Sequence, residues 1–146
     1  MKRIAFLSVL SLLPLLASAG GGVSITQGEG KLIVKIDGKL FTEYHYTNVP
    51  KPVLYPVHWT DGTPMTRRYP MEKALPDESD DHVHHRSLWW GHRHVKGGKS
   101  GNVTDFWGEG SNSGKQVQMK VEFTKDGSHA LLSIWEQDGA VIVYNA

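Results

Sequence analysis

The sequence contains no cysteine among its 146 residues. Disulfide bonds and thiolate chemistry are therefore excluded. After the N-terminus, no segment is apolar over the roughly 20 residues that a membrane-spanning helix needs. The motif Gly-x-Ser-x-Gly, the phosphate loop and the dinucleotide fingerprint are also absent, so nothing supports a serine hydrolase, a nucleotide-binding protein or a Rossmann-type enzyme.

An excess of charge is missing too. The chain has 16 Lys and Arg residues against 15 Asp and Glu residues. Removal of Lys2 and Arg3 with an N-terminal segment would leave 14 against 15. A nucleic-acid partner would require a clustered basic surface, so we expect none.

The N-terminus has the pattern of a secretory signal peptide. Lys2 and Arg3 precede the apolar run 4–16, and Ala17-Ser18-Ala19 is a small-residue cleavage site. The sequence thus predicts a signal peptide over residues 1–19 and a mature domain over residues 20–146. We expect export to the periplasm or the extracellular space, with no membrane span after cleavage.

Hydrophobic alternation predicts strands. Residues 31–36 and 40–47 flank Asp37-Gly38, a dipeptide favoured in type I′ turns, and so predict a β-hairpin. Within it, one face should carry Leu40, Tyr44 and Tyr46, and the other Glu43 and His45. Three prolines make residues 49–56 an edge segment or an extended crossing.

The last third of the chain continues this pattern. Residues 116–124 alternate, which predicts a strand whose core face carries Val117, Met119, Val121 and Phe123. Two further strands, in residues 129–137 and 140–144, follow turn signals. No segment beyond the N-terminus has a 3.6-residue apolar period. We therefore predict an all-β chain, with an antiparallel β-sandwich as its architecture.

The final predicted strand, residues 140–144, is apolar and uncharged. A strand of this kind with an unprotected edge is a template for pairing with another strand. We expect self-association through this C-terminal edge strand, and we interpret the chain as a truncated part of a longer protein.

The segment from Asp80 to Glu109 holds five of the eight histidines and three of the five tryptophans. Charged, imidazole and indole groups packed this densely are costly to bury unless each polar atom finds a partner. We therefore interpret the segment as a functional site.

Three kinds of chemistry are open for this site. The first is a divalent metal such as zinc, iron or manganese, because two His-x-His pairs would each project to one face of an extended backbone. The metal candidates are His82 and His84; His92 and His94 form the second pair, and Asp81, Asp105 or Glu109 could add an oxygen.

The second is acid/base catalysis without a metal, in which a carboxylate fixes the tautomer of a histidine. The candidate catalytic residues are His84, His85, His92, Asp105 and Glu109. The third is recognition of a sugar or its carboxylate by flat indoles and forked guanidinium donors. The candidate substrate-binding residues are Arg67, Arg68, Arg86, Trp90 and Trp107. Only one indole of the pair Trp89-Trp90 should be available, because the other points into the core if the segment is a strand.

The chain also resembles a known family. The resemblance covers about residues 53–137 and is carried by Tyr55-Pro56, Asp61-Gly62, Thr66-Arg67-Arg68-Tyr69-Pro70, the run from Asp81 to Trp89, Gly91-His92 and Asp105-Phe106-Trp107. These residues are similar to those of secreted bacterial proteins with a domain of unknown function, often labelled "PmoA family" or "methane oxygenase PmoA".

The resemblance implies a galactose-mutarotase-like β-sandwich, exported by bacteria that degrade polysaccharides. The matching site positions are His82, His84, His85, Arg86, His92, Asp105 and Trp107. The chain departs from the family by inserting residues 93–96, which leaves His94 outside the family pattern. Family members are about twice as long, which implies that this chain corresponds to an N-terminal half.

Taken with the residues, the resemblance favours an exported protein that binds or processes a small-molecule or oligosaccharide ligand through a histidine-rich cleft. A metal-dependent oxygenase or hydrolase and a non-catalytic carbohydrate-binding or structural module are the alternatives. Whether the protein is an enzyme is left open by the sequence.

Overall fold

The computed structural model of the chain describes residues 22–96, 101–123, 129–137 and 140–145, with side chains up to Val121 except that of Met119. The predicted signal peptide and its cleavage site lie outside the described residues. In the part of the chain that is described, no helix is long and apolar enough to cross a membrane.

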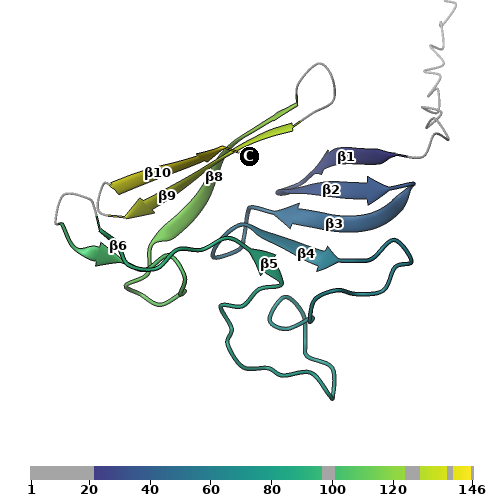
Figure 1. The fold of residues 1–146 in the computed structure, drawn as a ribbon, viewed down its shortest axis with the longest axis horizontal. Coiled ribbons are helices and arrows are strands. Elements are labelled where there is room, and N and C mark those ends of the chain that lie inside the picture. Colours follow the sequence, from purple (N-terminus) through teal and green to yellow (C-terminus); the bar gives the residue numbers. More distant parts are fainter. Residues whose placement is uncertain (1–21, 97–100, 124–128, 138–139, 146) are drawn as a thin grey trace, which may run out of the picture.

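The predicted all-β class is confirmed, because every element in the described ranges is a strand (Figure 1). The strands are β1 (Val23–Gly28), β2 (Lys31–Ile36), β3 (Lys39–His45), β4 (Val53–Val57), β5 (Leu88–Trp89), β6 (Val95–Lys96), β7 (Val103–Thr104), β8 (Lys115–Phe123), β9 (His129–Gln137) and β10 (Ala140–Asn145).

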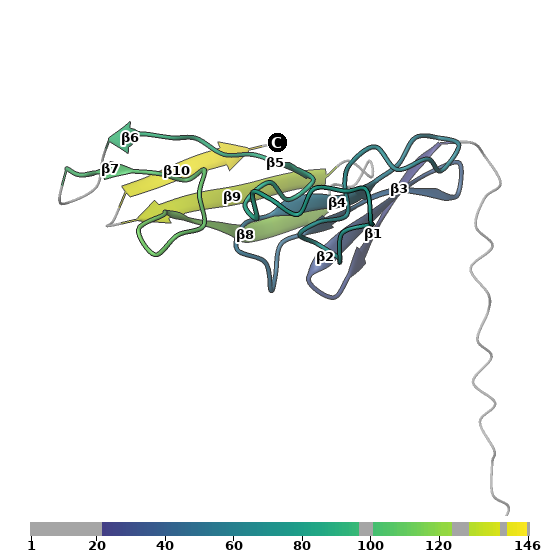
Figure 2. The ribbon, with the colours of Figure 1, turned by 90° about the horizontal axis from the view of Figure 1, so that it is seen from below.

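The strands form a five-stranded sheet in the order β1-β2-β3-β4-β5, a three-stranded sheet in the order β10-β9-β8, and the pair β6-β7. All pairings are antiparallel. The two larger sheets lie toward opposite ends of the molecule and approach each other near β3 and β8 (Figures 1 and 2). There the Tyr44 hydroxyl donates a 2.6 Å hydrogen bond to the Gln118 side chain.

The hairpin between β2 and β3 is formed as predicted. Asp37 and Gly38 both have positive φ, 51° and 78°, which a type I′ turn requires at its two central positions. The predicted faces are confirmed over residues 43–46: the rings of Tyr44 and Tyr46 lie 5.9 Å apart, and Glu43 lies 3.1 Å from the His45 imidazole. The register with β2 shifts between Leu40 and Thr42, so these contacts do not extend the face to Leu40.

The prediction that residues 49–56 form an edge segment or an extended crossing is wrong for residues 53–56, because β4 pairs with β3 on one side and β5 on the other. Pro56 is tolerated in β4 because β5 pairs only with Val53 and Leu54. On the β5 side, no partner strand lies opposite Pro56, so no ladder hydrogen bond is lost there because proline lacks an N–H. The register with β3 also shifts between Leu54 and Val57.

The predicted faces of β8 are wrong at its start. Val117, predicted to be core, is 42% exposed, whereas Gln116 is 8% exposed. The reason is local: Gln116 donates a 3.0 Å hydrogen bond to the backbone carbonyl of Phe106, and this bond satisfies a polar group inside the loop before β8. Val121 is the other predicted core residue of β8 whose side chain the structure describes, and it is half-buried.

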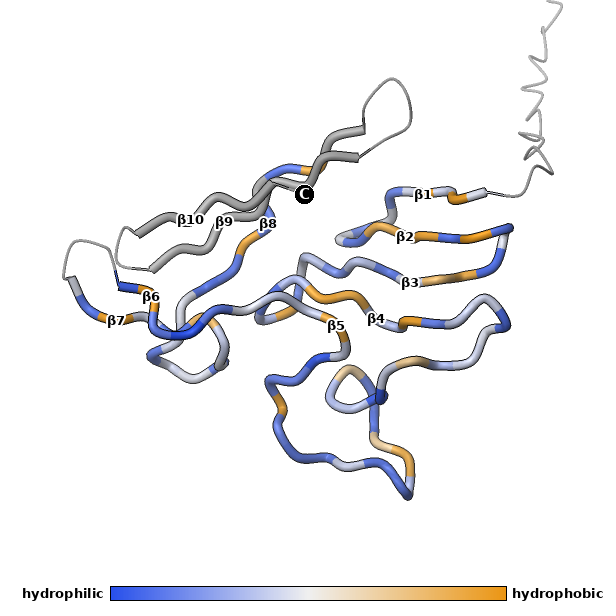
Figure 3. The backbone as a smooth tube through the Cα atoms, viewed as in Figure 1, coloured by the Kyte–Doolittle hydropathy of each residue, from blue (hydrophilic) through white to orange (hydrophobic). Residues whose placement is uncertain are grey.

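The buried apolar residues lie on the five-stranded sheet and on the loop that crosses to β8. Figure 3 shows apolar residues concentrated in β2 and β4, whereas the long loop between β4 and β5 is mostly hydrophilic. Phe106 packs from the crossing loop, where a Cβ at Gly114 would collide with its ring. The core thus holds the start of β4 and the loop before β8 next to each other; its apolar members are Leu32, Val53, Tyr55, Val57 and Phe106.

Candidate functional site

Three histidines are gathered by a turn that precedes β5. The His85 N–H donates a 2.8 Å hydrogen bond to the His82 carbonyl, and His82 has a φ of 47°. The predicted extended backbone is therefore wrong here, but the turn still brings the rings together. Ring centroids are 5.6 Å apart for His82 and His84, 5.0 Å for His82 and His85, and 4.3 Å for His84 and His85. We call residues 82–85 the histidine turn.

His92 and His94 do not join these rings. His94 has a φ of 56°, so this pair is not extended either. Both side chains are exposed, and His92 Nδ1 lies 2.8 Å from the Arg93 carbonyl. The backbone of His92 has a structural role, because its carbonyl accepts a 2.9 Å hydrogen bond from the Phe106 N–H. Among the ring contacts of the described residues, none joins predicted catalytic residue His92 to His84 or His85.

Two indoles pack beside the histidine turn. The Trp89 and Trp107 rings meet edge to face at 4.8 Å, and His85 lies 6.2 Å from the first and 5.9 Å from the second. Gly91 permits this position of Trp89, because a Cβ there would collide with the ring. Trp90 points elsewhere and is 62% exposed. We call the group of His82, His84, His85, Trp89 and Trp107 the imidazole–indole cluster.

Three charged side chains support this cluster from inside. Arg86 binds both Glu109 oxygens, with contacts of 2.8, 3.0 and 2.9 Å. Lys51 is only 2% exposed; its ammonium donates a 2.9 Å hydrogen bond to the Trp107 carbonyl and lies 3.5 Å from the Trp89 ring centroid. It is also 3.4 Å from Glu109. Burial lowers the pKa of Lys51, although Glu109 opposes this shift. We call Lys51, Arg86 and Glu109 the buried charge network.

A second set of charges lies on the loop before the histidine turn, and one of them, Arg67, bonds to the turn. Arg67 binds the Asp81 carboxylate at 2.9 Å and the carbonyls of Ser79, Asp81 and His82 at 3.2, 2.7 and 3.1 Å. Arg68 binds the Glu72 carboxylate, and its backbone N–H donates to Glu78. The surface charge network is therefore Arg67, Arg68, Glu72, Glu78 and Asp81. The guanidinium groups of both arginines, predicted to bind substrate, are engaged within the protein, as is that of Arg86.

Asp105 fixes the backbone next to Trp107. Its carboxylate accepts a 2.8 Å hydrogen bond from the Trp107 N–H and lies 3.8 Å from the Arg93 guanidinium. Among the described residues, neither Asp105 nor Glu109 hydrogen-bonds to a histidine. The carboxylate–histidine pairs proposed for proton transfer are therefore not formed in this structure.

The electrostatics of the histidine turn favour neutral imidazoles at His84 and His85. The pKa of His84 is lowered by burial first and then by His85, and the pKa of His85 is lowered by burial first and then by His82. A neutral imidazole has one N–H donor and one acceptor nitrogen. The turn thus offers both kinds of hydrogen-bonding group at neutral pH.

A metal site would need ligands that converge on one point. His82 and His84, the predicted metal candidates, are neighbours in the turn. Within the described ranges, however, no three His, Asp or Glu side chains are arranged to hold a metal ion.

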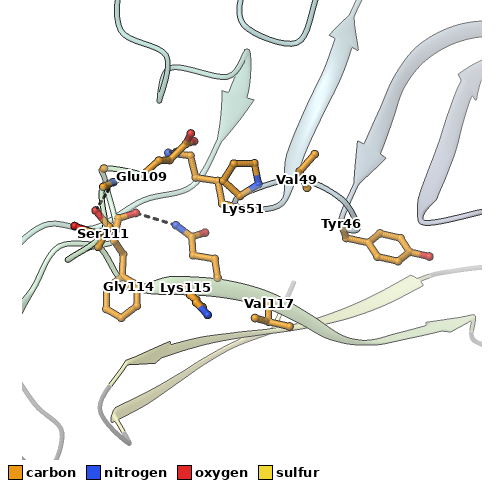
Figure 4. A pocket seen from close by; sticks show the side chains of 14 residues that line it. Tyr46, Val49, Lys51, Glu109, Ser111, Gly114, Lys115 and Val117 are labelled. Carbon is orange, nitrogen blue, oxygen red and sulfur yellow. Dashed lines mark hydrogen bonds and ion pairs between the residues drawn. The ribbon is translucent and has the colours of Figure 1, made fainter.

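A pocket of about 510 Å³ adjoins the buried charge network. Figure 4 shows it between the segment that leads into β4, which carries Val49 and Lys51, and the loop before β8, which carries Glu109 and Ser111. Lys51 and Glu109 thus belong both to the pocket wall and to the support of the imidazole–indole cluster.

Sequence reasoning missed two members of the site, Lys51 and Trp89. Nothing about a lysine between Pro50 and Pro52 marks it as buried, except that it precedes a strand of apolar residues. For the tryptophan pair, Gly91 is the signal that could have identified Trp89 as the packed indole. A glycine two residues after a tryptophan leaves space for its ring to lie over the backbone.

Comparisons with known proteins add a family but no activity. A 31-residue stretch is 65% identical to the Dihydro-heme d1 dehydrogenase of Pseudomonas aeruginosa; this stretch is 21% of the present chain and 6% of the enzyme. The chain thus covers a small fraction of that relative. No solved structure matches the chain. A family model described as "Family of unknown function (DUF6807)" matches residues 31–143, which is more than half of the sequence, and the chain therefore belongs to this family.

Proposed function

We propose that this protein binds a carbohydrate through the imidazole–indole cluster. The observation that carries the proposal is the grouping of three imidazoles in one turn, of which His85 contacts two indole rings. Sugar hydroxyls both donate and accept hydrogen bonds, as neutral imidazoles do. The C–H faces of a sugar ring are apolar and suit an indole surface.

The supporting charges favour a preformed binding surface. The Arg86–Glu109 pair is bidentate and largely buried, which fixes the chain directly after the histidine turn. Arg67 fixes the chain directly before it. A surface that is ordered before the ligand arrives loses less conformational entropy on binding. The resemblance to galactose-mutarotase-like proteins labelled "PmoA family" supports the same class of ligand.

Binding is the activity that these contacts support best, and turnover is supported less. General acid/base catalysis by histidine is strongest when a carboxylate orients the ring. Asp105 and Glu109 instead bind the Trp107 N–H and Arg86. We therefore propose a non-catalytic carbohydrate-binding module in preference to an oxygenase or a hydrolase.

A glycan array followed by titration calorimetry tests the proposal. His84→Ala and His85→Ala should each weaken binding of the best array ligand at least tenfold, because each removes a donor and an acceptor. His94→Ala is the matched control, since this exposed histidine lies outside the cluster. An array without any bound glycan, or equal losses in all three variants, would contradict the proposal.

The proposal includes export, which the N-terminal pattern supports. N-terminal sequencing of protein recovered outside the cytoplasm should give a mature start at or near Gly20. Recovery of the chain with Met1 would contradict it.

We also propose self-association through β10. This strand pairs with β9, and no strand of the described residues pairs with its other edge. A free edge is a template for another strand. Light scattering over a concentration series should show a mass that rises with concentration, whereas a constant monomer mass would refute the idea.

A further inference from the structure

We infer that Lys51 is a positioning residue for the carbohydrate site, whose buried ammonium holds Trp89 and Trp107 in the arrangement that the histidine turn packs against. The link to carbohydrate binding rests on the proposed function. The effect of Lys51 on the positions of the two indoles can be tested without a ligand.

The distances identify the partners of this ammonium. Lys51 Nζ is 2.9 Å from the Trp107 carbonyl and 3.5 Å from the centroid of the Trp89 ring. Its distance to Glu109 is longer, 3.4 Å to the nearer oxygen. That carboxylate is already bound by Arg86 through three contacts of 2.8 to 3.0 Å. The shortest hydrogen bond of Lys51 is therefore made to the backbone carbonyl of Trp107, and Glu109 has a closer cation, Arg86, than Lys51.

Burying a cation is costly unless its donors are used. A neutral side chain of the same length would avoid this cost but could neither donate to the Trp107 carbonyl nor attract the negative face of the Trp89 ring. The two interactions act on different tryptophans that meet at 4.8 Å. One charge thus ties together two segments of the chain, the end of β5 and the loop before β8.

Lys51 acts through the indoles and not on a ligand directly. Its side chain is 2% exposed, so a ligand on the cluster has almost no access to it. His85, in contrast, lies beside both Trp89 and Trp107. A shift of either indole would therefore change the surface on which His85 rests.

The test compares wild-type protein with Lys51→Met and with Lys35→Met as a matched control, since Lys35 is an exposed lysine of β2. The indole N–H resonances of Trp89 and Trp107 are followed by NMR, and D-galactose is the probe for binding. Lys51→Met should shift both resonances and weaken galactose binding at least fivefold. Lys35→Met should change neither.

An alkaline titration separates the charge from the shape of the side chain. Raising the pH should move the two indole resonances in wild-type protein with a midpoint below 10.5, the ordinary pKa of lysine, because burial lowers the pKa of Lys51. The other charged groups that act on its ammonium are Glu109, Arg86 and Asp105. Lys51→Met should lack this transition. If Lys51→Met fails to fold, the alkaline titration of the wild-type protein alone tests whether the charge of Lys51 positions the indoles.

The outcomes are distinct. Unmoved indole resonances in Lys51→Met, or no transition in wild-type protein, would overturn the inference. So would galactose binding that is undiminished in Lys51→Met. Moved indoles together with no galactose binding by wild-type protein would support the positioning role of Lys51 and count against the carbohydrate proposal instead.

Discussion

The histidine turn lies between two charge networks that use the same groups in different surroundings. In the surface charge network, Arg68 and Glu72 are 44% and 46% exposed. In the buried charge network, Arg86 and Glu109 are 18% and 11% exposed. Both are pairs of a guanidinium with a carboxylate. They differ in how much water surrounds them, so the comparison isolates the effect of burial.

Solvent exposure determines how much each network contributes to the stability of the fold. An exposed ion pair gains little, since water solvates and screens the separated charges nearly as well. A buried pair has lost its hydration, so its charges depend on each other. Removing one member of the buried charge network should therefore be far more damaging than the same change at the surface.

The largest effect is expected for Glu109→Gln, which leaves the charges of Lys51 and Arg86 buried without their carboxylate. We expect a loss of about 3 kcal/mol in the free energy of unfolding, the lower end of the range for breaking a buried pair. Urea denaturation measures it. Glu29→Gln, at an exposed turn between β1 and β2, is the control and should be neutral. A loss no greater than that of the control would show that Glu109 is effectively solvated.

The next effect concerns Arg67→Gln, which breaks the hydrogen bonds to the carbonyls of Ser79, Asp81 and His82. These bonds hold the loop at the histidine turn, so local opening should become easier by roughly 1 to 2 kcal/mol. Hydrogen exchange of the His85 N–H, which bonds to the His82 carbonyl, reports this opening. Arg68→Gln is the control, because Arg68 makes no bond to the turn. Equal exchange in both variants would contradict the anchoring role of Arg67.

A smaller effect is expected from acid. His84 and His85 have pKa values lowered from 6.5 in the folded state. Between the lowered values and 6.5 the unfolded chain binds more protons, so the free energy of unfolding should fall as the pH drops below about 6.5 and level off further down. The neighbouring Asp81 carboxylate titrates in a lower window, since hydrogen bonds from Ser79 and Arg67 lower its pKa from 3.8.

Urea melts between pH 7 and pH 5 measure this effect, with His84→Gln/His85→Gln and His94→Gln as test and control. The double variant should flatten the pH dependence, whereas the control should leave it unchanged. A wild-type stability that is constant over this range would show that the two imidazoles are not desolvated.

The strands were predictable because they depend on local chemistry. Asp37-Gly38 fixes a hairpin turn by backbone preference alone, and the alternation in residues 116–124 marks a strand whatever surrounds it. The faces of β8 were not predictable at its start, since Gln116 is buried by a hydrogen bond to Phe106, a residue of the preceding loop. The local sequence pattern therefore predicts that a strand forms, whereas tertiary contacts decide which of its side chains are buried.

The sequence indicated which stretch holds the candidate site, but not how its side chains are arranged. The density of histidine and tryptophan in residues 80–109 singled out the stretch that holds most of the imidazole–indole cluster, and the His84 and His85 rings lie together in it. That these residues form a functional site stays a prediction. The His-x-His spacing misled, because it assumed an extended backbone where His82 and His94 have positive φ. Lys51 was missed because its role depends on Trp107, 56 residues later in the chain.

The smallest effect should come from Glu72→Gln, the surface counterpart of Glu109→Gln. The pKa of Glu72 is lowered mainly by the hydrogen bond from the Tyr55 hydroxyl and then by that from Arg68. Glutamine keeps an acceptor for Tyr55 and loses only an exposed ion pair, so the melting temperature should stay within the error of the measurement.

The same variant should still change a local property. Burial and the Glu72 hydrogen bond raise the pKa of Tyr55 to about 12. Removing the carboxylate charge takes away part of this shift, so Tyr55 should ionise at a lower pH, which an ultraviolet absorbance titration detects. If Glu72→Gln instead destabilised the protein as much as Glu109→Gln, solvent exposure would not be what separates the two networks.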